Sequence, residues 1–144
     1  MKRYEHKTQY YETDQMGIIH HSNYIRWFEE ARIDLLEKLG IGYAEMEQQG
    51  IISPVLGLSC EYKKKTYFGE TVEIATRLTS FTGMKFNFSY EIFEKESGEL
   101  RCTGETRHCF LDKDSNPLRM KSKYPFIYQT MMAELGKLRS QPSD

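Results

Sequence analysis

Asp14 and His21 are the two residues of this chain whose types and spacing best fit acid–base or nucleophilic chemistry. They lie in the segment Tyr10–Tyr24, with Gly17 between them. A carboxylate can attack a carbonyl carbon or activate a water molecule, and a nearby histidine can assist. The structural alternative is that Asp14 caps a turn while His21 only fills space. The residue types alone leave both interpretations open.

A helix is predicted directly after this segment, from Tyr24 to Leu39. Apolar side chains recur there at helical spacing, at Tyr24, Phe28, Ala31, Leu35 and Leu39. Ser22 or Asn23 is expected to cap the start of the helix, and Gly40 to end it. The first turn would then direct unpaired N–H groups and the positive end of the helix dipole at the loop, which suits a developing oxyanion.

Alternation of apolar and polar residues predicts strands along most of the remaining chain. The expected strands are Arg3–Tyr10, Gly57–Lys65, Val72–Thr79, Lys85–Ile92 and Leu100–Phe110, with glycine turns at 69, 83 and 98. Short helices are expected at Tyr43–Gln49 and Phe126–Leu138, and His108 is expected in the core. This order indicates one α+β domain spanning residues 1–144, with about five antiparallel strands around one long helix. Because one helix cannot cover such a sheet and its edges, we expect an oligomer.

Composition argues against several classes of function. The net charge is −1 and no long basic run is present, so nucleic acid is not the expected partner. Cys60, Cys102 and Cys109 lack CxxC spacing, so neither a disulfide framework nor a metal site is predicted, and no cofactor is expected. The N-terminus does not resemble a signal peptide, and no apolar window approaches 18 residues. We therefore expect a cytoplasmic protein without a membrane span.

The loop and the helix after it resemble the signature of the 4-hydroxybenzoyl-CoA thioesterase family. The shared pattern is Thr13-Asp14-x-x-Gly17-x-x-x-His21-x-x-Tyr24, followed by Phe28-Glu29-x-Ala31-Arg32. The chain is most similar to the bacterial acyl-CoA thioesterase branch, which includes the Tol–Pal-associated enzymes. The resemblance extends from about Tyr4 to Met120 and includes the turn Tyr62-x-x-x-Thr66-x-Phe68-Gly69-Glu70.

This resemblance implies a hotdog fold, a curved antiparallel sheet wrapped around a central helix, with active sites at a subunit boundary. It implies metal-free hydrolysis of acyl-CoA thioesters by a homodimer or a dimer of dimers. Asp14 would act as nucleophile or general base, and the backbone N–H of residue 21 would polarise the thioester carbonyl. The His21 side chain would orient water or substrate, while Gly17 and Tyr24 would shape the pocket. Glu29 would orient the substrate, or serve as the alternative catalytic carboxylate.

The residues that hold the phosphates of coenzyme A are less specified. Candidates are Lys63, Lys65 and Lys85, and the alternative for each is a solvated strand edge. Lys85 stands where many relatives carry a small hydroxyl residue. The pattern does not decide between coenzyme A and acyl carrier protein as the carrier, nor does it identify the acyl group.

Two other functions on the same fold are alternatives to thioester hydrolysis. A hotdog hydratase or dehydratase would carry other histidine-containing motifs around the helix, and none is found in this sequence. A non-catalytic acyl-CoA-binding or assembly protein would not need Asp14 or the motif at the helix start. Hydrolysis of an acyl-CoA thioester is therefore the favoured prediction, although fold alone never establishes activity.

Overall fold

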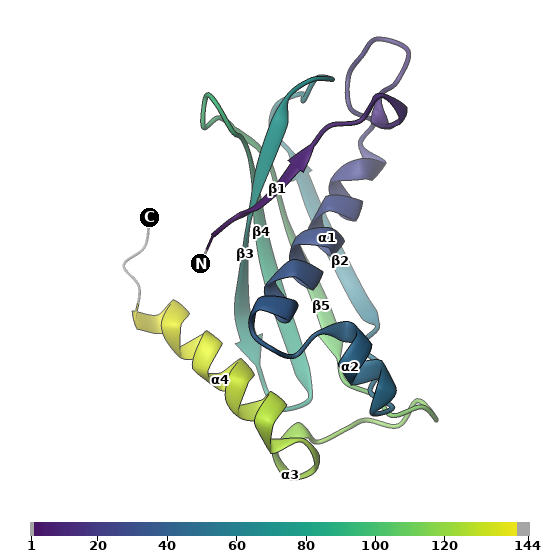
Figure 1. Ribbon diagram of the computed structural model, residues 1–144, viewed down its shortest axis with the longest axis vertical. Helices are drawn as coiled ribbons and strands as arrows, with labels where there is room; N and C mark the ends of the chain where they lie inside the picture. The colour runs from purple at the N-terminus through teal and green to yellow at the C-terminus, as the bar shows by residue number, and fades with distance from the viewer. Residues whose placement is uncertain (1, 141–144) are drawn as a thin grey trace.

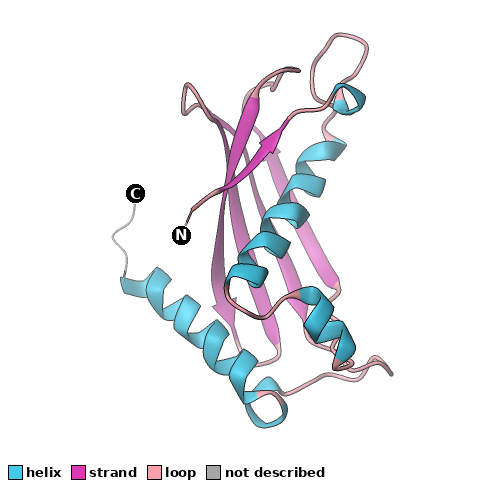
Figure 2. Ribbon diagram, in the orientation of Figure 1, coloured by secondary structure: helices cyan, strands magenta, loops and turns pink. Residues whose placement is uncertain are grey.

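Helix α1 (Ser22–Lys38) lies across one face of a curved antiparallel sheet of five strands (Figures 1 and 2). The computed structural model describes residues 2–140, with side chains to residue 137. Around α1 the chain forms β1 (Tyr4–Lys7), η1 (Tyr10–Glu12), α2 (Tyr43–Gln48), β2 (Val55–Tyr62), β3 (Thr71–Phe81), β4 (Lys85–Glu94), β5 (Leu100–Cys109), α3 (Met120–Lys123) and α4 (Pro125–Ser140). The strand order is β1-β3-β4-β5-β2, which confirms the predicted α+β class.

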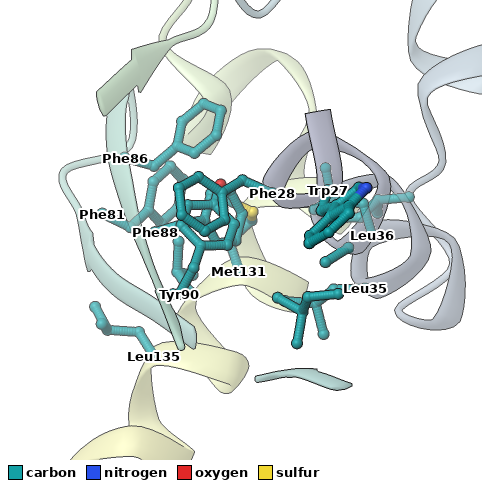
Figure 3. Packing of buried hydrophobic residues seen from close by; sticks show 14 of the residues in the cluster. Trp27, Phe28, Leu35, Leu36, Phe81, Phe86, Phe88, Tyr90, Met131 and Leu135 are labelled. Atoms are coloured by element: carbon teal, nitrogen blue, oxygen red, sulfur yellow. The ribbon is translucent and has the colours of Figure 1, made fainter. Parts of the chain in front are cut away.

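The core lies between α1 and the sheet. In β4 the side chains of Phe86, Phe88, Tyr90 and Ile92 are buried, while those between them are partly exposed, as period-2 alternation predicts. Phe28 of α1 stacks on Tyr90 with ring centroids 4.5 Å apart. Figure 3 shows Trp27, Phe28, Leu35 and Leu36 of α1 packed with the aromatic residues of the sheet.

Helix α4 adds to this core, which the sequence analysis did not foresee. Ile127, Met131 and Leu135 are buried in the same cluster as the α1 residues. Figure 3 shows Met131 and Leu135 beside this cluster. Helix α4 packs mainly against β3 (Figure 1). The expectation of an oligomer assumed that only one helix faces the sheet. Because α4 packs on the sheet as well, that assumption is wrong, and the expectation needs another basis.

For α1, the predicted C-terminal end is confirmed and the predicted N-terminal cap is not. Gly40 has a φ of 81°, and the N–H groups of Gly40 and Ile41 donate to the carbonyls of Glu37 and Leu36, which closes α1 in a Schellman motif. At the other end the predicted cap is wrong, because His21 occupies the N-cap position. The Ser22 hydroxyl contacts the His20 ring instead, and the Asn23 side chain donates to backbone carbonyls.

Strand β2 is displaced from its predicted position. It begins at Val55 and ends at Tyr62, so Lys63, Lys64 and Lys65 follow the strand rather than belong to it. The predicted strand Arg3–Tyr10 shortens to β1 (Tyr4–Lys7), because residues 10–12 turn into η1. Residues 8–12 and 63–65 therefore lie outside the strands.

Candidate active site

Asp14 sits in a small hairpin formed by residues 13–19. Its N–H donates to the Ile18 carbonyl over 2.8 Å, and Gly17 supplies the turn with a φ of 75°. The Asp14 Oδ1 atom accepts the N–H groups of Met16 (2.7 Å) and Ile18 (3.2 Å). Within the described part of the chain, Oδ2 accepts no hydrogen bond, and the side chain is exposed. The carboxylate thus caps the turn with one oxygen and leaves the other open to solvent.

The hairpin is tied to the turn that precedes β3. The Ile19 N–H donates to the Thr66 carbonyl over 2.8 Å, and the Phe68 N–H donates to the Gly17 carbonyl over 3.1 Å. Thr66 is fully buried beneath this contact. This turn, which resembles that of the family, holds the hairpin in place.

His21 occupies the start of α1. Among the described residues, nothing accepts a hydrogen bond from its backbone N–H, so that donor is available to a ligand. Its carbonyl accepts the Tyr62 hydroxyl over 3.2 Å, which joins α1 to the end of β2. The His21 ring is exposed, and its centroid lies 4.2 Å from that of His20 and 6.0 Å from that of Tyr62.

A groove of about 830 Å³ opens between this helix start and the segment after β2. Apolar and aromatic side chains line it at Ile18, Ile19, His21, Tyr24, Tyr62 and Tyr67. The charged lining residues are Glu99, Arg101 and a run of three lysines, Lys63, Lys64 and Lys65, which we call the lysine wall. Of the predicted residues, His21, Tyr24, Lys63 and Lys65 line it. Asp14, Gly17 and Glu29 do not, although Ile18, which pairs with Asp14 across the hairpin, does.

Arg101 organises the lysine wall and was missed in the sequence. Its carbonyl accepts the N–H groups of Lys63 (2.9 Å) and Lys64 (3.1 Å), and its guanidinium donates to the Lys65 carbonyl (2.8 Å). The same guanidinium binds both oxygens of Glu70 at 2.9 and 3.0 Å. The hydrogen bond from Arg101 lowers the pKa of Glu70. No spacing rule connects Arg101 to this segment, because sheet pairing brings them together.

Lys85 does not join these lysines within one chain. It pairs with Cys109 at one end of β5, whereas Lys63 and Lys64 pair with Arg101 at the other. The separation along β5 is eight residues, roughly 26 Å at about 3.3 Å per residue. The three predicted phosphate ligands therefore divide into a pair at the groove and one remote residue.

Glu12 is the second residue that the sequence analysis missed. Its carboxylate is buried and accepts hydrogen bonds from His6, Gln9 and Trp27. The only signal in the sequence was an acidic residue two positions before Asp14.

Among the described residues, no three His, Cys, Asp or Glu side chains gather as metal ligands would. No helix in the described part of the chain is long and apolar enough to cross a membrane.

Comparison with known families places this geometry in context. The model of the thioesterase-like superfamily matches residues 8–135, which include the hairpin, the groove and strands β2 to β5. The chain belongs to this superfamily. Its members share the hotdog fold, so the predicted architecture is confirmed.

Individual relatives agree with this thioesterase assignment. The chain is 37% identical over 122 residues to YneP of Bacillus subtilis (strain 168), a protein provisionally named an acyl-CoA thioesterase; the match covers 84% of this chain and 88% of YneP. It is 24% identical over 121 residues to the acyl-CoA thioester hydrolase YbgC of Escherichia coli O6:H1, covering 84% and 87% of the two chains. The crystal structure of DHNA-CoA thioesterase from Staphylococcus aureus superposes with a TM-score of 0.91, at 37% identity, over 99% of this chain and 96% of that one.

Proposed function

We propose that this thioesterase hydrolyses acyl-CoA thioesters to a free acid and coenzyme A. One observation carries the proposal: the unpaired N–H of His21 and the Asp14 hairpin flank a groove whose far wall bears three lysines. A donor at a helix start suits the oxyanion that forms when a thioester carbonyl is attacked. The names of the Bacillus subtilis and Staphylococcus aureus relatives point to the same reaction class.

In the proposed reaction, the thioester carbonyl oxygen accepts the N–H of His21. The open Oδ2 of Asp14 either attacks the carbonyl carbon or takes a proton from an attacking water. The C–S bond then breaks, and the coenzyme A thiolate leaves and is protonated. In the covalent route, water afterwards cleaves the acyl–Asp14 anhydride. Both routes consume one water and give one acid and one thiol.

The lysine wall is the proposed site for the coenzyme A phosphates. Lys63, Lys64 and Lys65 are exposed and held on a backbone that Arg101 fixes. Lys63 also pairs with Glu61 over 2.7 Å, so Lys64 and Lys65 are the freer cations.

Replacing Lys64 or Lys65 with serine should raise KM for an acyl-CoA about two- to fivefold, as expected for exposed ion pairs. KM for the same acyl group on N-acetylcysteamine, which has no phosphates, should not change. A Lys85→Ser variant that raised KM equally would add Lys85 to this site.

For the acyl group, we propose an aromatic one. Tyr24, Tyr62 and Tyr67 line the groove together with Ile18 and Ile19, and such walls favour flat apolar rings. The Staphylococcus aureus relative named for DHNA-CoA shares 37% of its residues with this chain. Membership of the Tol–Pal-associated branch remains a prediction from the motif, since identity to YbgC is only 24%.

We further propose that the working unit is at least a homodimer joined along β2. This edge strand exposes Val55, Leu56, Leu58 and Tyr62, each between 44% and 49%. An exposed apolar edge strand in one chain is a template for pairing with another. A second copy would cover this edge beside the groove.

A panel of acyl-CoA thioesters tests the function, with release of the free thiol as the measurement. Turnover with an aryl-CoA above that with aliphatic chains of similar size is expected. Binding of coenzyme A thioesters without release of thiol would favour the non-catalytic alternative. Addition of water to an enoyl-CoA without thioester cleavage would favour a hydratase.

A further inference from the structure

Glu12 carries the most heavily hydrogen-bonded carboxylate near the candidate site, yet it does not line the groove. The residue is only 4% exposed. Oε1 accepts the Gln9 N–H at 2.7 Å and lies 2.9 Å from His6 Nε2, while Oε2 accepts the Trp27 indole N–H at 2.8 Å. Burying a carboxylate is costly unless several donors surround it, and here three elements supply them.

The donors come from three separate segments of the chain. His6 belongs to β1, Gln9 precedes η1, and Trp27 lies on the second turn of α1. The His6 ring also packs on the Trp27 ring, with centroids 4.8 Å apart. Burial alone would raise the pKa of Glu12, but the hydrogen bonds from His6, Trp27 and Gln9 together lower it. The carboxylate is therefore ionised at neutral pH.

The backbone of Glu12 links this buried anchor to both halves of the candidate site. Its carbonyl accepts the His20 N–H over 2.8 Å and the Asn23 side-chain amide over 2.9 Å. Glu12 precedes Asp14 by two residues, and its carbonyl binds both the residue before His21 and the first turn of α1. Movement of Glu12 would change the position of Asp14 relative to the His21 N–H.

We propose that Glu12, held by His6 and Trp27, is a positioning residue that fixes the Asp14 carboxylate relative to the His21 N–H. It touches neither substrate nor reacting atoms, and it acts through the geometry of the hairpin. A misplacement of about 1 Å in such an arrangement can cost about 10²-fold in rate. The proposal rests on the proposed role of Asp14, so its test includes a measurement that is independent of activity.

The test variant is Glu12→Gln, which keeps the shape but leaves one acceptor oxygen for three donors. We expect kcat for the best acyl-CoA to fall at least about tenfold, with KM changed less than about twofold. Amide hydrogen exchange at Asp14 and His20 should quicken, while exchange in the core strands β4 and β5 stays slow. A purely structural Glu12 would instead lower stability throughout and speed exchange in every element.

Glu30→Gln is the matched control. Glu30 lies 3.4 Å from the other ring nitrogen of His6 and accepts the Tyr4 hydroxyl over 2.8 Å, but within the described part of the chain it forms no hydrogen bond or ion pair with the hairpin. The same chemical change there should leave kcat within about twofold and hairpin exchange unaltered. If Glu12→Gln does not fold, His6→Phe removes one donor while keeping a ring on Trp27, and the same pattern is expected at smaller size.

Combination with Asp14→Asn separates the two claims. If Glu12 acts through Asp14, adding Glu12→Gln to Asp14→Asn should cause little further loss of residual hydrolysis. Full additivity in the double variant would overturn the positioning role. A folded Glu12→Gln protein with kcat within twofold of wild type and unchanged hairpin exchange would also overturn it. Absence of hydrolysis by the wild type would instead contradict the proposed function, and the exchange measurement would still test the anchor.

Discussion

His21 offers two separate groups to a substrate, a ring and a backbone N–H. The N–H is unpaired within the described residues, and a side-chain substitution leaves it in place. We therefore predict that His21→Ala lowers kcat by less than Asp14→Asn does, because the oxyanion donor survives. Steady-state kinetics of the two variants, with circular dichroism to confirm folding, checks this ranking. Equal inactivation of both would show that the ring itself is essential.

His108 links the core to the pH dependence of stability. It is fully buried, its Nε2 lies 2.7 Å from the Thr106 hydroxyl, and its ring stacks on Phe86. Burial, together with the nearby Arg32 charge, lowers its pKa from 6.5 to about 4. The unfolded chain therefore binds a proton between pH 6.5 and 4 that the native chain does not, so the free energy of unfolding falls as pH falls through this window.

We predict that His108→Leu removes this part of the pH dependence. For a shift of this size, the histidine contributes at most about 3 kcal/mol to the loss of stability between pH 7 and 4. Urea unfolding at pH 7 and pH 4.5 measures the difference for both proteins. The comparison uses the change with pH rather than the absolute stability, because the variant also loses the Thr106 hydrogen bond. An unchanged pH dependence in the variant would contradict the prediction.

At the scale of elements, α1 approaches β5 so closely that only glycine fits at position 104. A Cβ added there would overlap the Phe28 ring and lie 3.0 Å from the Ser59 carbonyl oxygen. We predict that Gly104→Ala lowers the free energy of unfolding by about 1–3 kcal/mol, the usual cost of overpacking a core. Gly136→Ala in α4, where nothing lies within 4 Å, is the control and should be neutral or stabilising by up to about 1 kcal/mol. Denaturant melts of both variants distinguish the sites.

How far the sequence predicted these elements depends on the range of the interactions that fix them. Period-2 alternation in β4 and helical spacing in α1 are local, and both were read correctly. The cap of α1 was not, because Asn23 donates to Glu12 eleven residues earlier instead of capping its own helix. The end of β2 was also misplaced, since pairing with Arg101 rather than local pattern decides it.

The residues of the candidate site also divide into those that a local segment predicts and those that long-range contacts bring in. Asp14, Gly17, His21 and Tyr24 lie in one contiguous segment, so the resemblance of that segment to the family sufficed to propose them. Arg101 and Glu12 act through partners at sequence separations that no pattern encodes, and they emerged only from the folded chain. Lys85 was grouped with Lys63 because of its charge and its position in the family pattern, and the sheet separates the two residues.

For the whole molecule, the β2 edge is the feature that calls for a partner. We predict that Leu58→Lys, which places a charge on that edge, lowers the assembly state and reduces hydrolysis in parallel. Phe126→Lys is the control, because this apolar residue of α4 is 65% exposed and lies away from β2. Light scattering at micromolar concentration with matched activity assays measures both. A fully active wild-type monomer would overturn the prediction of an obligate dimer.

The most direct test of the account is Asp14→Asn. The amide oxygen can still accept the N–H groups of Met16 and Ile18, so the hairpin should persist and the thermal midpoint should move little. An amide is a far weaker nucleophile and base, so kcat for the best acyl-CoA should fall by at least about 10²-fold with KM nearly unchanged. Hydrolysis near the wild-type rate would show that Asp14 is not the catalytic carboxylate and would direct attention to Glu29. Unfolding of the variant would show that Asp14 serves the turn instead.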